Sequence, residues 1–473
     1  MKTRIEYDSI GNMKVPVDAY YGIQTLRANN NFKITNKTIH PLFIVSLAQI
    51  KKAAAITNRD SYTLEVNIAN AIIYACDEII AGKFHNQFIV DPIQGGAGTS
   101  ANMNANEVIA NRAIEILGGV KGNYSIVHPN DHVNMAQSTN DVFPSAGKLT
   151  VLKMLPKAIL ELQRLYQATK LKAIEFDSVI KMGRTQLQDA VPIRLGQSFN
   201  AYASMIKRDI DRLIKVKDEM LTLNMGATAI GTSVNASTDY LNNIIKNLQI
   251  VTGVNVVQSE DLIDATQNLD GFVTISGTLK SCAVNLSKMA NDLRLLSSGP
   301  KTGLGEINLP AKQNGSSIMP GKINPVIPEV VSQVAYNIIG NDFTITMAAE
   351  AGQLELNAFE PVLFYNLFES IETLQNATMT FIDNCISGIT ANKERCEELV
   401  NNSIGLVTAL CPHIGYKKAS ELAKEALSTG RPIKEIITSK RILTPEQLKE
   451  VLNPFTMTEV DRTSDVKINK HAI

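Results

Sequence analysis

The most regular hydrophobic pattern in the chain lies between about residues 267 and 296, where apolar residues recur in alternating steps of three and four. This spacing predicts one long helix with an apolar seam along a single side. The seam consists of Phe272, Ile275, Leu279, Cys282, Leu286, Met289, Leu293 and Leu296. Such a helix extends about 45 Å at 1.5 Å per residue. Gly299 and Pro300 end it, because glycine caps helices and proline cannot continue them.

Similar patterns predict further helices in the middle of the chain. A second seam runs from Leu152 to Tyr166, where Pro156 predicts a kink or a late start. A third helix is expected after Pro328, because proline is favoured in a first helical turn, and a fourth contains the apolar residues between Ile206 and Ile214. Strand-like alternation is scarce. We therefore predict a bundle of unusually long helices.

The pattern changes on both sides of this bundle. Up to about Thr139 polar and glycine-rich segments interrupt the chain, and beyond about Asn392 the predicted helices are shorter and more charged. The predicted fold is therefore all-α with three domains. They are an N-terminal domain (1–139), a central long-helix bundle (140–394) and a small helical C-terminal domain (395–473).

Composition excludes several classes of protein. Lysine and arginine number 46, as do aspartate and glutamate, and no block of like charge could follow a phosphate backbone, so we expect no nucleic-acid partner. No apolar run approaches the roughly 18 residues of a membrane span, and the start lacks the apolar core of a signal peptide, so we expect a cytoplasmic protein without membrane contact. Five cysteines without C-x-x-C spacing are expected to be reduced.

Four segments rich in glycine, hydroxyl and amide residues interrupt the helical pattern. They are residues 95–100, 128–141, 183–189 and 315–325. Loops of this kind offer many neutral donors and suit a small anion, although each one singly is explained equally well as a turn or helix cap. Residues 315–322 are not a phosphate-binding loop, because five residues rather than four separate the glycines. Pro129 between His128 and His132 argues against a helical zinc pair, so no metal site is predicted.

Residues 315–325, Gly-Ser-Ser-Ile-Met-Pro-Gly-Lys-Ile-Asn-Pro, resemble the G-S-S-x-M-P-x-K-x-N-P signature of the fumarase/aspartase superfamily. Members of this superfamily eliminate an amine or hydroxide from a succinyl skeleton and release fumarate. The other three segments resemble the remaining conserved regions of the family in the expected order. The resemblance therefore extends from Arg4 to about Thr408.

Within the superfamily, residues 15–22 and 181–192 are more similar to the aspartase branch than to class II fumarases. The latter usually carry a tryptophan in the first segment, and this chain has none. They typically place Thr-His where Thr185 and Gln186 stand, although some aspartases have histidine there too. The resemblance implies a carbon–nitrogen lyase that converts L-aspartate reversibly to fumarate and ammonia. A class II fumarase acting on malate is the alternative, and a catalytically silent structural relative is the third hypothesis.

The resemblance also implies a role for each site residue. Ser316 is the expected proton acceptor, acting as an alkoxide on a mobile loop. The carboxylate that becomes doubly charged in the aci-carboxylate intermediate is held by hydroxyl residues, namely Thr99, Ser138, Thr139 and Ser317. The second carboxylate is held by Lys322, with hydrogen bonds from Asn324 and Thr185. The substrate ammonium donates to Asn140 and Gln186. Glu329 is explained equally by orienting Gln186 or by the helix dipole.

The family resemblance further implies a homotetramer in which each active site gathers residues from three subunits. The apolar seam between Phe272 and Leu296 is expected to contribute to the tetrameric core, because an isolated bundle would leave much of it exposed. No cofactor is required by the resemblance, although divalent cations activate some relatives. Residues 128, 130 and 131 resemble a second anion site of fumarases, and we assign them no role.

Overall fold

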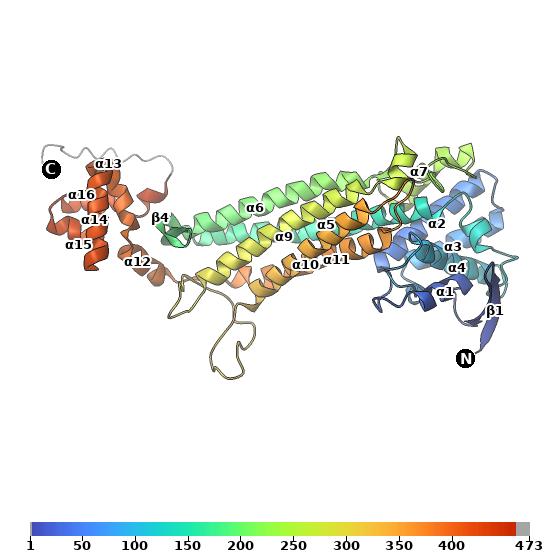
Figure 1. Ribbon diagram of the computed structural model, residues 1–473, viewed down its shortest axis with the longest axis horizontal. Helices are drawn as coiled ribbons and strands as arrows, with labels where there is room; N and C mark the ends of the chain where they lie inside the picture. The colour runs from blue at the N-terminus through green and yellow to red at the C-terminus, as the bar shows by residue number, and fades with distance from the viewer. Residues whose placement is uncertain (1, 460–473) are drawn as a thin grey trace. The chain divides into compact units, whose positions relative to one another are not determined.

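Helices make up most of the computed structural model, which describes residues 2–459 (Figure 1). Its strands are short and form only two-stranded pairs within those residues, which confirms the all-α prediction. The described chain divides into two compact units. Unit 1 contains the residues up to 160 together with 210–283 and 335–375, and unit 2 contains 161–209, 284–334 and the residues from 376 onward. The predicted three-domain division stays a prediction. Nowhere between residues 2 and 459 does a helix combine the length and the apolar character needed to cross a membrane.

Unit 1 combines an N-terminal hairpin with a group of packed helices. The hairpin pairs β1 (Thr3–Asp8) with β2 (Gly11–Pro16), and β5 (Thr222–Leu223) pairs with β6 (Val257–Gln258). The helices are α1 (Ile23–Asn31), α2 (Pro41–Asp60), α3 (Val66–Ile80), α4 (Thr99–Ile116), α7 (Thr238–Thr252) and α8 (Leu262–Gln267). Helix α2 contacts α3 and α7, and α4 contacts α1 and α3. Residues 53–55 of α2 are three buried alanines, which favour the helix and let its neighbours approach closely.

Unit 2 combines a second hairpin with the C-terminal helices. The hairpin pairs β3 (Ile180–Thr185) with β4 (Gln188–Arg194), and β7 (Ile307–Asn308) pairs with β8 (Thr390–Ala391). The helices are α12 (Lys393–Asn402), α13 (Cys411–Ile414), α14 (Tyr416–Thr429), α15 (Ile433–Ser439) and α16 (Pro445–Val451). Ile180 and Met182 of β3 join the same hydrophobic core as Leu406, Leu422 and Ile436. Burial of these side chains therefore attaches the hairpin to the C-terminal helices.

Five long helices each contribute residues to both units. They are α5 (Thr139–Glu175), α6 (Leu195–Val216), α9 (Asp270–Leu296), α10 (Val326–Glu350) and α11 (Glu360–Asn384) (Figure 1). In unit 2, Tyr202 of α6 donates to Asp292 of α9 at 2.8 Å. In unit 1, Asn341 of α10 donates to Ser370 of α11 at 3.1 Å. The prediction of a long-helix bundle is confirmed. Pro156 lies inside α5, so the late start that it predicted is wrong; the buried neighbours Leu155 and Ile159 hold the helix across the missing amide.

The predicted apolar seam lies on α9 and is covered within the chain. Apart from Leu296, its side chains are at most 2% exposed. The helix begins at Asp270 rather than near residue 267, because Asn268 has an extended backbone that separates α8 from α9. The expectation that this seam faces other subunits is therefore wrong. A periodic pattern shows which face is apolar but not which part of the chain covers it.

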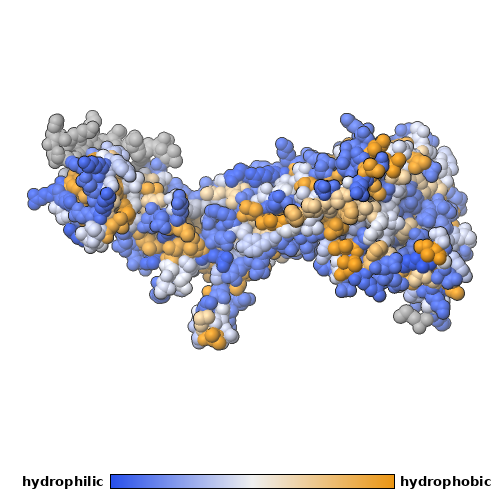
Figure 2. Space-filling view, viewed as in Figure 1, coloured by the Kyte–Doolittle hydropathy of each residue, from blue (hydrophilic) through white to orange (hydrophobic). Residues whose placement is uncertain are grey.

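A different apolar stripe is exposed on helix α10. Tyr336, Ile339, Phe343 and Met347 are 60%, 37%, 70% and 49% exposed. They recur in steps of three and four, so they lie on one face of the helix. Figure 2 shows hydrophobic side chains, in orange, at the surface along the long helices. Contiguous apolar surface of this kind is typical of a protein–protein contact.

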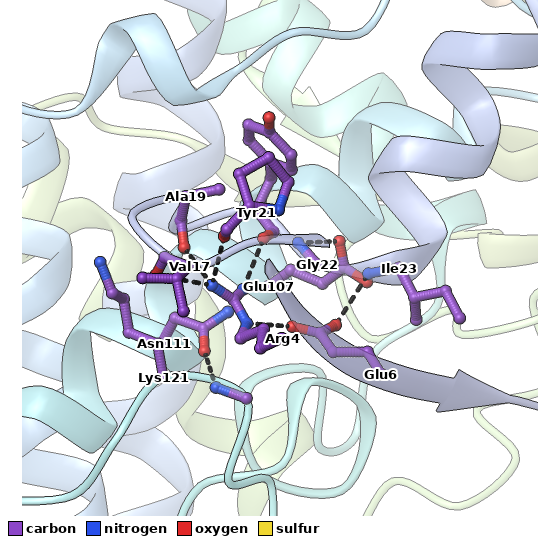
Figure 3. Close-up of polar contacts among 12 residues, drawn as sticks. Arg4, Glu6, Val17, Ala19, Tyr21, Gly22, Ile23, Glu107, Asn111 and Lys121 are labelled. Carbon is purple, nitrogen blue, oxygen red and sulfur yellow. Dashed lines mark hydrogen bonds and ion pairs between the residues drawn. The ribbon is translucent and has the colours of Figure 1, made fainter. Parts of the chain in front are cut away.

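The segment between β2 and α1 is anchored by two charged residues that the sequence analysis missed (Figure 3). Arg4 donates to four backbone carbonyls of residues 16–21 at 2.8–3.2 Å. Glu107 of α4, which is 1% exposed, accepts the amides of Gly22 at 2.8 Å and Thr25 at 3.1 Å. A carboxylate at this position stabilises the amino-terminal end of α1. The anchored segment includes the residues whose pattern resembles the aspartase branch.

Candidate active site

The first group of predicted site residues lies where helices α4 and α5 begin. Thr99 is the first residue of α4 and donates to the carbonyl of Gly96 at 2.7 Å. Thr139 is the first residue of α5, and its hydroxyl accepts the side-chain amide of Asn102 of α4 at 3.1 Å. The two helix ends are therefore adjacent. Because the free amides at helix amino termini carry partial positive charge, this arrangement suits a carboxylate.

Gly98 is the N-cap of α4, and its backbone conformation lets the helix begin at Thr99. Its φ is +85°, and a Cβ at residue 98 would lie 2.4 Å from the ring of Phe143. Gly98→Ala is expected to lower the free energy of unfolding by about 2–4 kcal/mol, because it adds overpacking to a left-handed backbone. Denaturant unfolding measures this loss. Gly118→Ala is the matched control, because Gly118 has a φ of +80° but open space around it. An equal loss in both variants would contradict the role of the Phe143 contact.

A buried polar network that the sequence analysis missed lies beside this group. The carboxylate of Asp141 accepts the amides of Ser138 at 2.9 Å and of Gly226 and Thr228 at 3.1 Å, and burial raises its pKa to about 6. The ammonium of Lys51 is also completely buried and donates to Asn134 Oδ1 at 2.7 Å. The same oxygen accepts the amides of residues 102 and 106 at 3.2 Å. Its signals in the sequence were the closely spaced asparagines of α4 and the polar segment 128–141, which contains Asn134 and Asp141.

Because of Lys51, the unfolding free energy of the protein is expected to rise as the pH becomes alkaline. Burial lowers the pKa of its ammonium from 10.5 to about 7. When folding lowers the pKa of a base, the unfolding free energy is highest above the unfolded pKa. It decreases as the pH falls toward the folded pKa, because the unfolded chain then binds a proton that the folded chain does not. Between about pH 7 and 10, the unfolding free energy of the wild type should therefore rise relative to Lys51→Met by up to about 1.4 kcal/mol per pH unit. Thermal unfolding across this range measures the difference, with Lys52→Met as the control because the Lys52 side chain is only partly buried. Parallel curves for the wild type and Lys51→Met would contradict the prediction.

The second group, Thr185 and Gln186, lies at the tip of the β3–β4 hairpin. Thr185 pairs with Gln188, and the two residues between them have positive φ, +52° for Gln186 and +61° for Leu187. A two-residue turn with this geometry is typical of tight hairpins but normally carries glycine or asparagine. Thr185 and Gln186 are both exposed. The structure therefore presents the two side chains outward on a strained turn, where strain is often tied to function.

The third group lies in the loop between β7 and α10. Gly315 donates to the carbonyl of Lys322 at 2.8 Å, and the side chain of Asn324 donates to the carbonyl of Gly315 at 2.9 Å, so the loop closes on itself. The hydroxyl oxygen of Ser316 accepts the amides of Ile318 at 3.2 Å and Met319 at 3.0 Å. Two amide donors directed at one oxygen favour its anionic form. These two donors would help to stabilise an alkoxide at this oxygen.

The three groups of predicted site residues are divided between the two units. The residues of the first group belong to unit 1, and those of the second and third groups belong to unit 2. Among residues 2–459, no hydrogen bond joins the tip of the hairpin to the loop of residues 315–324. Thr99, Ser317 and Lys322 are exposed, as are Thr185 and Gln186. The carboxylate of Glu329 lies 3.7 Å from Arg294, and its orientation of Gln186 stays a prediction.

Comparisons with known proteins show similarity to lyases over most of the chain. A family profile described as Lyase matches residues 11–340, and one described as Fumarase C C-terminus matches residues 406–459. The chain is 53% identical to an aspartate ammonia-lyase of Bacillus subtilis (strain 168), over 96% of each sequence.

Two solved structures are also similar. One is a fumarate lyase:delta crystallin from Brucella melitensis bound to cobalt, at 51% identity and a TM-score of 0.95, covering 97% of this chain and 100% of that one. The other is a recombinant class II fumarase from Schistosoma mansoni, at 36% identity and a TM-score of 0.93, covering 96% of this chain and 99% of that one. Identity is therefore lower to this fumarase than to the ammonia-lyase.

Proposed function

Because the chain belongs to the fumarase/aspartase superfamily of lyases, we propose that it catalyses the reversible elimination of ammonia from L-aspartate to give fumarate. The observation that carries this function is the 53% identity to an aspartate ammonia-lyase over 96% of both sequences. The chemistry of Gln186 agrees with an amine leaving group. Ammonium leaves already protonated, and an amide carbonyl accepts its hydrogen bond without titrating.

In the proposed mechanism, Ser316 removes a proton from the carbon next to the side-chain carboxylate of aspartate. The two amides that donate to its hydroxyl oxygen support this role, because they stabilise the alkoxide. The negative charge moves onto the neighbouring carboxylate, and the carbon–nitrogen bond then breaks. Thr99 and Thr139 at adjacent helix ends support the binding of this aci-carboxylate, since preorganised donors at a developing charge are usually the largest catalytic contribution.

We further propose that Ser138 and Ser317 complete the site for this carboxylate. Lys322, Asn324 and Thr185 bind the other one. Asn140 has its side-chain amide nitrogen 2.7 Å from the carbonyl of Ala229, which leaves its oxygen for the substrate ammonium. The reaction so described requires no cofactor, and dialysis against EDTA followed by Mg²⁺ addition separates a requirement from activation. We propose a cytoplasmic location.

The active site is proposed to form between three subunits of a homotetramer. Two observations support this proposal: the exposed positions of Thr99, Gln186 and Lys322, and the apolar stripe of α10 between Tyr336 and Met347. Burial of that stripe in a helical core would stabilise the assembly, and loops from separate subunits could then meet. Light scattering should give four times the chain mass of 51.6 kDa. A monomer that turns over aspartate would contradict the shared site.

The test of the proposed function is a side-by-side assay of the purified protein with L-aspartate and L-malate, in which fumarate is followed at about 240 nm. Fumarate from aspartate and not from malate is the expected result. Fumarate from malate alone would instead identify a class II fumarase. An intact oligomer that acts on neither substrate would identify a catalytically silent relative.

A further inference from the structure

Unit 2 contains a buried group of three charges outside the predicted substrate contacts. Glu306 is 0% exposed and lies just before β7. Its carboxylate oxygens accept from Nη1 of Arg184 at 2.9 and 3.1 Å, and the ammonium of Lys181 lies 3.6 Å away. Both cations come from strand β3 and are themselves largely buried. The hydrogen bond between Arg184 and Glu306 spans 122 residues of sequence.

Arg184 directly precedes Thr185 on the strand that leads to the tip of the hairpin. The side chain of Arg184 is only 13% exposed, whereas Thr185 and Gln186 are exposed and lie at a turn with two positive φ values. An exposed turn in this backbone conformation keeps one geometry only if its surroundings hold it. Two side-chain contacts lie beside the tip and provide this restraint: the ion pair of Arg184 with Glu306, and the hydrogen bond from the hydroxyl of Ser403 to the carboxylate of Asp189 at 2.8 Å on the paired strand.

The backbone of Glu306 is fixed from the opposite side. Its amide donates to the carbonyl of Leu296 at 2.9 Å, and its carbonyl accepts the amide of Asn392 at 2.9 Å. The side chain of Asn392 also donates to the carbonyl of Gly305 at 2.7 Å. These bonds tie Glu306 to the end of α9 and to the start of α12. The loop that carries Ser316 begins a few residues later, so one fixed residue connects this loop to the hairpin.

We propose that Glu306 is a positioning residue for ammonia elimination: by holding Arg184, it sets where Thr185 and Gln186 meet the substrate. The inference rests on the proposed function. A purely stabilising role explains the arrangement less well, because burying a carboxylate with two cations gives little net stability compared with apolar side chains of similar volume. Positioning a substrate-binding hairpin tip explains why these three charges are buried although their burial adds little stability.

The test is the kinetics of Glu306→Gln, which keeps the shape of the side chain but removes its charge. We expect KM for L-aspartate to rise by on the order of tenfold, while kcat changes less, because the tip residues contact ground state and transition state alike. When Glu306→Gln is combined with Thr185→Val, KM should increase by less than the product of the two single increases, because both variants remove the same contact. Multiplicative effects would overturn the proposal.

Two further variants keep the test decisive. Arg184→Lys keeps the charge but not the geometry of the guanidinium, and should raise KM in the same direction even if Glu306→Gln folds poorly. Asp342→Asn is the matched control, because Asp342 is a 5% exposed carboxylate that contacts Lys280 at 2.6 Å and Ser276 at 2.7 Å in unit 1. This control should lower the melting temperature without changing KM.

The wild-type assay separates the two levels of inference. If the wild type does not act on aspartate, the proposed function fails and takes this inference with it. If the wild type is active but both Glu306→Gln and Arg184→Lys lose only melting temperature and active fraction, with KM unchanged, the positioning role alone is overturned.

Discussion

Replacing Ser316 by alanine is expected to lower kcat for ammonia elimination by about 10²–10⁴-fold, the usual contribution of a general base. Among residues 2–459, the hydroxyl oxygen of Ser316 accepts only the two loop amides of Ile318 and Met319, and it lies in a partly exposed loop. Its removal should therefore cost little stability and should leave the oligomer intact. The measurements are kcat from fumarate absorbance, the melting temperature and the mass in solution.

Substrate binding provides the internal check on this result. Succinate has both carboxylates of aspartate but no leaving group, so its dissociation constant should be nearly the same for Ser316→Ala and wild type. Asn314→Ala is the control from the same exposed loop, and it should retain kcat because it removes no proposed catalytic group. If Ser316→Ala keeps kcat within tenfold of the wild type, the proton acceptor is another group.

Replacing Lys322 by alanine is expected to reduce kcat/KM for L-aspartate by two to three and a half orders of magnitude. The estimate corresponds to the loss of about 3–5 kcal/mol when one partner of a desolvated ion pair is removed. Lys322 makes its loop hydrogen bonds through its backbone, with Gly315 and Met319, so the alanine variant keeps them. Because the bound carboxylate stays anionic throughout the reaction, much of the loss should appear in KM.

Two further substitutions test whether the effect of Lys322→Ala is specific to this lysine. Lys322→Arg keeps the charge but changes its geometry, so its kcat/KM for L-aspartate should lie between those of the wild type and Lys322→Ala. Lys312→Ala removes another exposed cation from the same loop and should leave KM unchanged. An unaltered KM in Lys322→Ala, or an equal rise in Lys312→Ala, would show that this lysine does not bind the fixed carboxylate.

Much of the architecture could be predicted from local pattern alone. The steps of three and four between Phe272 and Leu293 predicted α9, and Pro328 predicted the first turn of α10, which begins at Val326. Helix periodicity and the position of proline follow from backbone geometry within a few residues, so a single sequence is enough to show them. The signature around Ser316 also located the loop between β7 and α10 and indicated the family before any tertiary contact was known.

The contacts that organise the site could be found only in the tertiary structure. Nothing local indicates that Arg184 meets Glu306 across 122 residues, or that Asn102 joins the start of α5 at Thr139. The sequence also misassigned the outward apolar face, which belongs to α10 rather than α9. The physical reason is common to all three: a residue type and its spacing determine which groups need a partner, whereas the packing of distant segments determines which partner they obtain.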